Sequence, residues 1–135
     1  MRAQAAVDYF TIVSVALLIL IPLILYINQL LTGYRDDIRV SLAEDTVNKL
    51  GESVNWVYSQ GPPAKLTLEN IFIPEGIEET SLDNNMILFR IKTSAGIPDV
   101  YYETVPSLDG SIPSKSGYYQ ISLTAYENNV TINVI

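Results

Sequence analysis

The 135-residue chain contains neither cysteine nor histidine. Without cysteine it can form no disulfide, thiolate metal site or cysteine nucleophile, and without histidine it lacks the commonest general base and the usual zinc ligand. Carboxylates, lysines and tyrosines are the only side chains left for chemistry, and no short motif suggests the paired carboxylates of a hydrolase. The sequence therefore predicts a protein that is not an enzyme and that uses no metal or other cofactor.

Positive charge is also scarce. The formal net charge is −7, and all but one of the eight basic and all but one of the fifteen acidic residues follow Tyr34. A domain with this excess of carboxylates repels phosphate backbones. We therefore expect no nucleic-acid partner.

Charge is absent altogether between Asp8 and Arg35, a stretch of 26 residues. As a helix this stretch is about 39 Å long, whereas the hydrocarbon core of a bilayer is about 30 Å thick. A cleaved secretory signal has a shorter apolar core and small residues before the cut, but Asn28-Gln29 stands where those residues are needed. The sequence predicts a retained single-pass membrane helix, with a removed signal or a buried soluble helix as alternatives. Charges on the two flanks leave its orientation undecided.

Proline is missing from Tyr34 to Gln60, and the helical pattern continues beyond the apolar stretch. Apolar residues recur there at spacings of three and four, which predicts an amphipathic extension over 35–60. We expect this seam to pack on the chain's own domain; a free coiled coil is the alternative, although the seam covers little more than two heptads. The members of the seam are Val40, Ala43, Val47, Leu50, Val54 and Val57.

Proline and glycine mark the weak points and the end of this long helix, which is predicted to run from about residue 5 to about residue 60. Pro22 removes a backbone hydrogen bond within the span, so we expect a helix kink there. Gly61 is suited to a left-handed cap, and Pro62-Pro63 cannot continue the helix.

After Pro63 the period of the apolar residues changes from 3.6 to 2. This pattern predicts five strands, at 65–73, 86–93, 99–105, 118–127 and 130–135. Asn128-Asn129 separates the last two and predicts a short hairpin turn, since asparagine accepts positive φ. The expected fold class is α+β: a long N-terminal helix followed by a small antiparallel β domain over 64–135, packed on the outer half of the helix.

Asp8 is an unusual residue for the start of so apolar a run. One interpretation is a charge at the lipid boundary, where a carboxylate costs less than at mid-span. A second comes from the surrounding sequence, "RAQAAVDYF", which has a basic and a small residue before Gln4, small residues after it, and an acid four residues beyond it. This motif resembles the class III signal peptide of archaeal type IV pilin-like proteins. The weaker matches "IPEGI" at 73–77 and a Gly-Tyr-Tyr strand near the carboxyl end resemble their β domains.

The resemblance implies processing by a membrane-bound prepilin peptidase. The cut would fall between Ala3 and Gln4, so residues 1–3 form a short leader and 4–34 the transmembrane and filament-core helix. The new ammonium of Gln4 and the carboxylate of Asp8 would be one helical turn apart. Between neighbouring subunits this pair would set the axial register. Asp8 stands where the family usually has glutamate.

The resemblance further implies a pilin-like fold, a homo-oligomer formed through the N-terminal helix, and a β domain exposed outside the cell. The predicted function is a structural subunit of a type IV pilus-like surface filament, with adhesion as its expected role. The alternative is a single-pass anchored extracellular protein, or a minor accessory subunit, that does not polymerise.

Three further features of the β region have more than one interpretation. Asn129-Val130-Thr131 is a possible glycosylation site, although a pattern of three residues also arises by chance. The segments 83–85 and 109–110 contain oxygen ligands but not the spacing of a calcium loop, and are predicted to be turns. In Tyr101-Tyr102 and Tyr118-Tyr119, one tyrosine of each pair should lie in the core and the other on the surface.

Overall fold

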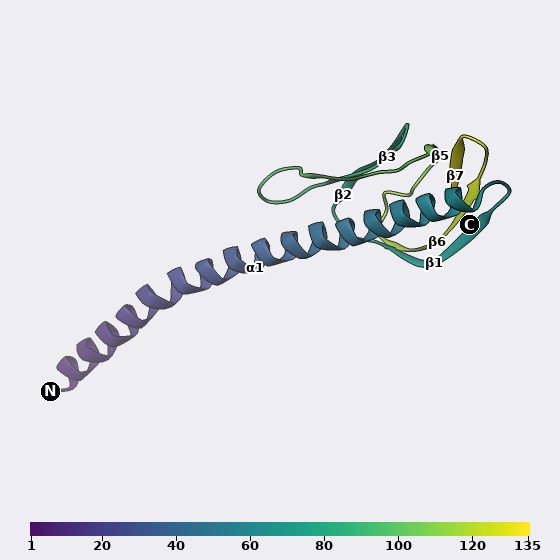
Figure 1. The fold of residues 1–135 in the computed structure, drawn as a ribbon. Coiled ribbons are helices and arrows are strands. Elements are labelled where there is room, and N and C mark those ends of the chain that lie inside the picture. The colour runs from purple at the N-terminus through teal and green to yellow at the C-terminus, as the bar shows by residue number, and fades with distance from the viewer. The chain divides into compact units, whose positions relative to one another are not determined.

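The computed structural model describes all of residues 1–135 and shows one long helix followed by seven strands (Figure 1). The chain divides into two compact units, Met1–Arg35 and Asp36–Ile135. The predicted α+β fold is confirmed. The elements are α1 (Arg2–Gln60), β1 (Lys65–Ile73), β2 (Ile77–Asp83), β3 (Met86–Ile91), β4 (Asp99–Glu103), β5 (Ser107–Gly110), β6 (Gly117–Ala125) and β7 (Asn129–Val134).

The first unit consists of the N-terminal part of α1. Its apolar side chains are exposed, and its most apolar stretch is not buried against any other part of the chain. A long apolar helix of this kind is compatible with a membrane anchor. The helix continues through Pro22 without a break, and the kink expected at that residue stays a prediction.

The end of α1 follows the predicted chemistry. Gly61 has a φ of 78°, the left-handed conformation that glycine adopts without strain. Its N–H donates to the carbonyl of Tyr58 at 3.1 Å, and its own carbonyl accepts from Ala64 at 2.9 Å. Gly61 is thus the cap from which the chain turns back into β1.

Two sheets make up the β domain, with strand orders β1-β6-β7-β5 and β2-β3-β4. Neighbouring strands are antiparallel except β5 and β7, which are parallel. The sequence pattern missed β2 and β5, and the expected turn at Asp109-Gly110 is wrong because both residues belong to β5. Both strands lie at sheet edges; β2 carries charge at Glu78 and Glu79, and β5 is only four residues long. Neither β2 nor β5 therefore shows a clear alternation of apolar and polar residues.

Asparagines with positive φ occur in this domain, but not at the predicted place. The hairpin between β6 and β7 forms as expected, with Tyr126 N–H donating to the carbonyl of Asn129 at 2.8 Å. The positive φ expected at Asn128-Asn129 is wrong. The residues other than glycine with positive φ are Asn84, in the turn between β2 and β3, and Asn70, at a register shift within β1.

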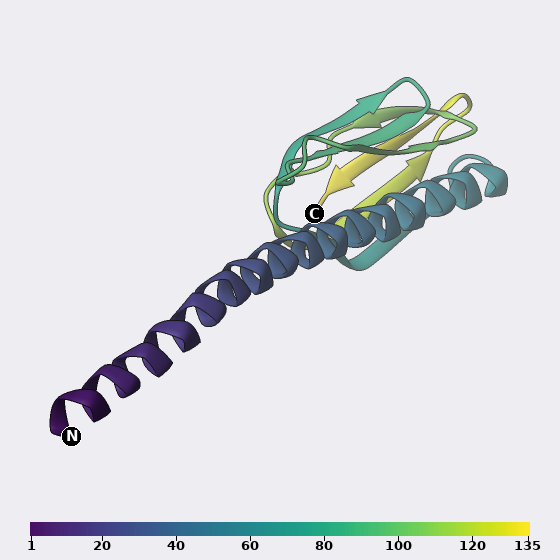
Figure 2. The same ribbon diagram turned by 90° about the vertical axis from the view of Figure 1, so that its left-hand side faces the viewer.

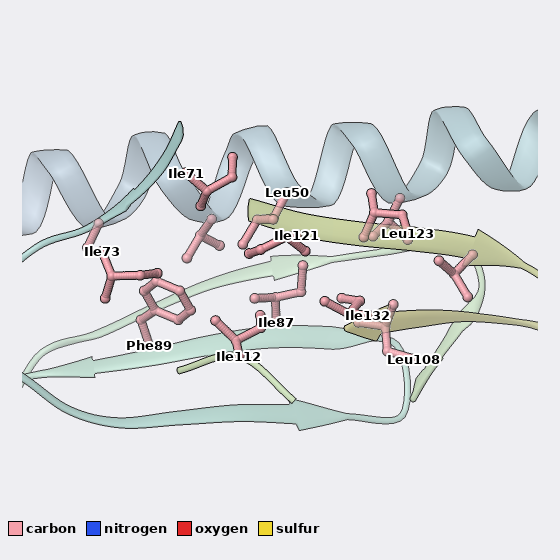
Figure 3. Packing of buried hydrophobic residues seen from close by; sticks show 14 of the residues in the cluster. Leu50, Ile71, Ile73, Ile87, Phe89, Leu108, Ile112, Ile121, Leu123 and Ile132 are labelled. Atoms are coloured by element: carbon pink, nitrogen blue, oxygen red, sulfur yellow. The ribbon is translucent and has the colours of Figure 1, made fainter. Parts of the chain in front are cut away.

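The core lies between the outer half of α1, residues 36–60, and the two sheets. Figure 3 shows this packing around Leu50, Ile121 and Ile87. The predicted seam is buried within the chain's own domain, so this interpretation is confirmed over the free coiled coil. Five members of the seam are completely buried and Val40 is partly buried: Ala43, Val47, Leu50, Val54 and Val57.

The outer half of α1 runs alongside the strands (Figure 2) and contacts an edge strand of each sheet. The hydroxyl of Thr46 donates to the carbonyl of Phe72 in β1 at 2.7 Å. Gly51 leaves space for the ring of Tyr102 in β4, which a Cβ at Gly51 would meet at 2.0 Å. Asn55 Oδ1 accepts from the N–H of Val105, just after β4, at 2.8 Å. The helix thus joins β1 to β4 and forms one side of the domain.

Candidate functional site

The N-terminal motif occupies the first turns of α1, where Ala3, Gln4 and Asp8 are all exposed. Because Gln4 and Asp8 are four residues apart on a continuous helix, they lie on the same face. The ion pairs of the chain all lie beyond Tyr34, so the carboxylate of Asp8 has no charged partner within the chain. The carboxylate is therefore open to a partner from another molecule.

Hydroxyl groups within the apolar stretch donate hydrogen bonds to backbone carbonyls of the same helix. Thr11, Ser14 and Thr32 each donate to the carbonyl four residues earlier, at 2.8, 2.8 and 3.0 Å. In hydrocarbon an unpaired hydroxyl is costly, and this bonding within the helix removes most of that cost. These three side chains are thus compatible with a lipid environment.

A polar cluster lies where α1 enters the second unit. Asp36 Oδ2 accepts from the backbone N–H of Ser94 at 2.9 Å and from its hydroxyl at 2.5 Å. The guanidinium of Arg39 lies 3.7 Å from Asp36 and 3.8 Å from Glu75. We call these four residues the Asp36 cluster. It attaches the β1–β2 and β3–β4 loops to the helix.

Of the two acids in this cluster, Asp36 is the less exposed and accepts both hydrogen bonds from Ser94. Its side chain is 13% exposed. The hydrogen bond from the Ser94 hydroxyl, followed by that from the Ser94 N–H, lowers the pKa of Asp36 from its ordinary value of 3.8. Sequence reasoning missed this contact, since 58 residues separate the partners and no local pattern joins them.

The lowered pKa predicts an acid-sensitive contact. A carboxylate whose folded-state pKa lies below 3.8 stabilises the fold above that pH, and the stabilisation is lost as the pH falls through the folded-state value. We expect the NMR shift of the Ser94 amide proton to change on acidification in a step whose midpoint lies below 3.8. Asp36→Asn should remove this step. A step above 3.8 in the natural sequence would contradict the assignment.

A second charged group links the strands of the smaller sheet. Arg90 in β3 donates to Glu79 in β2 at 2.8 Å and to Asp99 in β4 at 3.2 Å. The hydrogen bond to Asp99, with the charges of Asp99 and Glu79, raises the pKa of Arg90. All three side chains are at least 41% exposed, so the ion pairs contribute little stability.

The possible glycosylation site Asn129 lies at the start of β7. Its side-chain nitrogen, to which a glycan would be attached, donates to the carboxylate of Asp109 in β5. This contact crosses the parallel strand pair. Modification of Asn129 stays a prediction.

The paired tyrosines are divided as predicted. Tyr102 and Tyr119 pack against the core, whereas Tyr101 and Tyr118 are 60% and 71% exposed. The ring of Tyr118 lies 5.0 Å from that of Phe72, in a tilted arrangement. One member of each pair is therefore available on the surface.

Three shallow hollows in the surface of the second unit, two of them between α1 and β1, each contain a single carboxylate. These belong to Asp45, Glu69 and Glu52. None of these three hollows contains the pair of carboxylates that most glycoside hydrolases use.

No protein-family model, curated protein or solved structure matches the chain.

Proposed function

We propose that this chain is a structural subunit of a type IV pilus-like surface filament in archaea. The observation that carries the proposal is the start of α1: a possible processing site at Ala3-Gln4, an acid at Asp8, and then 26 residues without charge. An ordinary membrane anchor has no need of an acid at that position, because a carboxylate near hydrocarbon is unfavourable unless it is paired.

In the proposed mechanism a prepilin peptidase removes residues 1–3 and leaves the amino group of Gln4 as the new terminus. Before assembly this ammonium and the Asp8 carboxylate reduce each other's cost at the membrane edge. When helices leave the lipid and bundle, the carboxylate of one subunit pairs with the ammonium of the next. Packing of the 9–34 segments supplies most of the assembly energy, and the charge pair sets the register.

The β domain would then lie on the outside of the filament. Its core is complete without a second chain, because the seam of α1 is already covered by its own sheets. A domain whose core is complete in one chain is also compatible with the second candidate function, an anchored extracellular protein or minor accessory subunit that remains a monomer.

Processing is the first test of the proposal. Intact-mass analysis of the membrane-extracted protein should show loss of Met1 to Ala3, and Gln4→Arg should retain these residues because a bulky cation does not fit the cleavage position. The matched control is Gln60→Arg, the same change at the exposed far end of α1, which should still be cut. A complete leader in cells that possess the peptidase would contradict the proposal. Electron microscopy of sheared filaments then distinguishes a subunit from an anchored monomer.

A further inference from the structure

The β3–β4 loop, residues 92–98, lies at the end of the β domain where the helix enters it. Ser94 in this loop is bonded twice to Asp36, the second residue after the uncharged stretch. The loop is therefore attached to the helix only two residues beyond the uncharged stretch. Val105 lies toward the opposite end of the domain, where its N–H donates to Asn55 Oδ1. Asn55 is about 28 Å farther along the helix.

The composition of this loop differs from that of the domain around it. Residues 93–98 read "TSAGIP" and carry no charge, although the domain as a whole is strongly acidic. Ile97 is 51% exposed. Lys92 precedes the tip and Asp99 follows it, so charges of opposite sign stand at its two ends and none lies within it. An uncharged tip with an exposed isoleucine is suited to the interfacial region of a lipid bilayer, where apolar side chains enter the boundary between headgroups and acyl chains.

The loop is also held in one conformation. Lys92 N–H donates to the carbonyl of Gly76 at 2.7 Å, and both the N–H and the hydroxyl of Thr93 donate to the carbonyl of Gly96, at 2.8 and 2.9 Å. Together with the bonds between Ser94 and Asp36, these contacts fix both sides of the tip. A preorganised loop loses little entropy when it meets a surface.

We propose that the β3–β4 loop is a second membrane contact, in which Ile97 enters the lipid interface beside the exit of α1. This inference rests on the anchoring role assigned to α1 under the proposed function. The contact holds the β domain against the bilayer in the unassembled subunit. It has to be given up when the subunit leaves the membrane for a filament.

The single tryptophan of the chain makes a clean test possible. Trp56 is replaced by Phe, and Ile97→Trp is then introduced as the only reporter in the full-length chain. Val105→Trp in the same background is the matched control, because Val105 is 75% exposed and lies at the far end of the domain. Both proteins are placed in phosphatidylcholine vesicles, with or without phosphatidylcholine brominated in the upper acyl chain. Tryptophan emission is recorded after flotation.

We expect both variants to float with the vesicles, and only Ile97→Trp to show a blue-shifted emission that brominated lipid quenches. Flotation without quenching of Ile97→Trp would overturn the loop contact and leave the anchor standing. Equal quenching of the two variants would also overturn it, because the domain would then lie flat on the bilayer. A blue shift that depends on protein concentration but not on bromine would assign the loop to another copy of the chain. Failure to float would overturn the anchor and the loop contact together.

A second pair of variants tests the link to the helix. In the Ile97→Trp background, Asp36→Ala should reduce quenching by brominated lipid because the loop loses both bonds at Ser94. Asp37→Ala removes the neighbouring exposed acid and should leave quenching unchanged. Equal quenching in the two variants would show that the Asp36 bonds do not position the loop.

Discussion

Asp8→Asn is expected to abolish filaments while membrane insertion and cleavage of the leader continue. Removal of a charge makes the helix more apolar, so insertion is not impaired. In the bundle, however, each ammonium of Gln4 would lose its partner. An uncompensated buried charge costs on the order of 3 to 5 kcal/mol per subunit, a penalty that every added subunit repeats. The measurement is the amount of sheared filament relative to the processed protein in the membrane.

Asp8→Glu is the matched control for this experiment, because it keeps the charge and adds one methylene group. It should assemble, whereas Asp8→Asn should not. The β domain should fold equally in all three proteins, since Asp8 lies in the first unit and makes no ion pair in the chain. If Asp8→Asn forms filaments as well as the natural sequence, the register role is wrong and the anchored monomer becomes the better description.

Gly110→Ala is expected to cause the largest loss of stability from a single methyl group. Gly110 has a φ of 104° and pairs with Ile132 across the parallel strands. A Cβ at this position would lie 1.9 Å from the carbonyl oxygen of Ile132, a backbone atom that cannot rotate away. Strain in the backbone and steric overlap together should lower the free energy of unfolding by about 2 to 5 kcal/mol. Urea unfolding of the full chain in detergent micelles, followed by near-ultraviolet circular dichroism, would measure it.

Gly61→Ala separates the two causes. Gly61 also has positive φ, at 78°, but nothing lies within 4 Å of its Cβ position. This variant should therefore lose only the conformational part, about 1 to 2 kcal/mol. Equal losses in the two variants would mean that the edge strand β5 moves to accept the methyl group, and that the close approach to Ile132 is not a constraint.

The parts of the fold that follow a regular period were predictable from sequence. Apolar spacings of three and four indicated the buried stripe of α1 from Ala43 to Val57, and alternation indicated the inward-facing residues of β6 and β7. The edge strands β2 and β5 were not predictable, because an edge strand buries little of one face and needs no apolar alternation. The parallel pairing of β5 with β7 depends on how two distant segments meet, which no local pattern specifies.

In the candidate site, too, the local relations were predictable from sequence and the long-range contacts were not. Gln4 and Asp8 could be placed on one helix face from their spacing alone, since that relation is local. The contact between Asp36 and Ser94 joins positions on either side of three strands, and Arg90 meets Glu79 and Asp99 only through strand register. Such long-range contacts carry no signature in the sequence of either partner.

The position of the outer half of α1, between β1 and β4, has an evolutionary consequence. Five of the fully buried core residues belong to this helix, so the sheets cannot be inherited without it. Recombination at Lys65 would separate the sheets from part of their own core, whereas recombination at Asp36 would transfer a complete domain to a different anchor. Within one continuous helix, residues before Asp36 contribute nothing to this core, while the buried residues after it must change together with the strands.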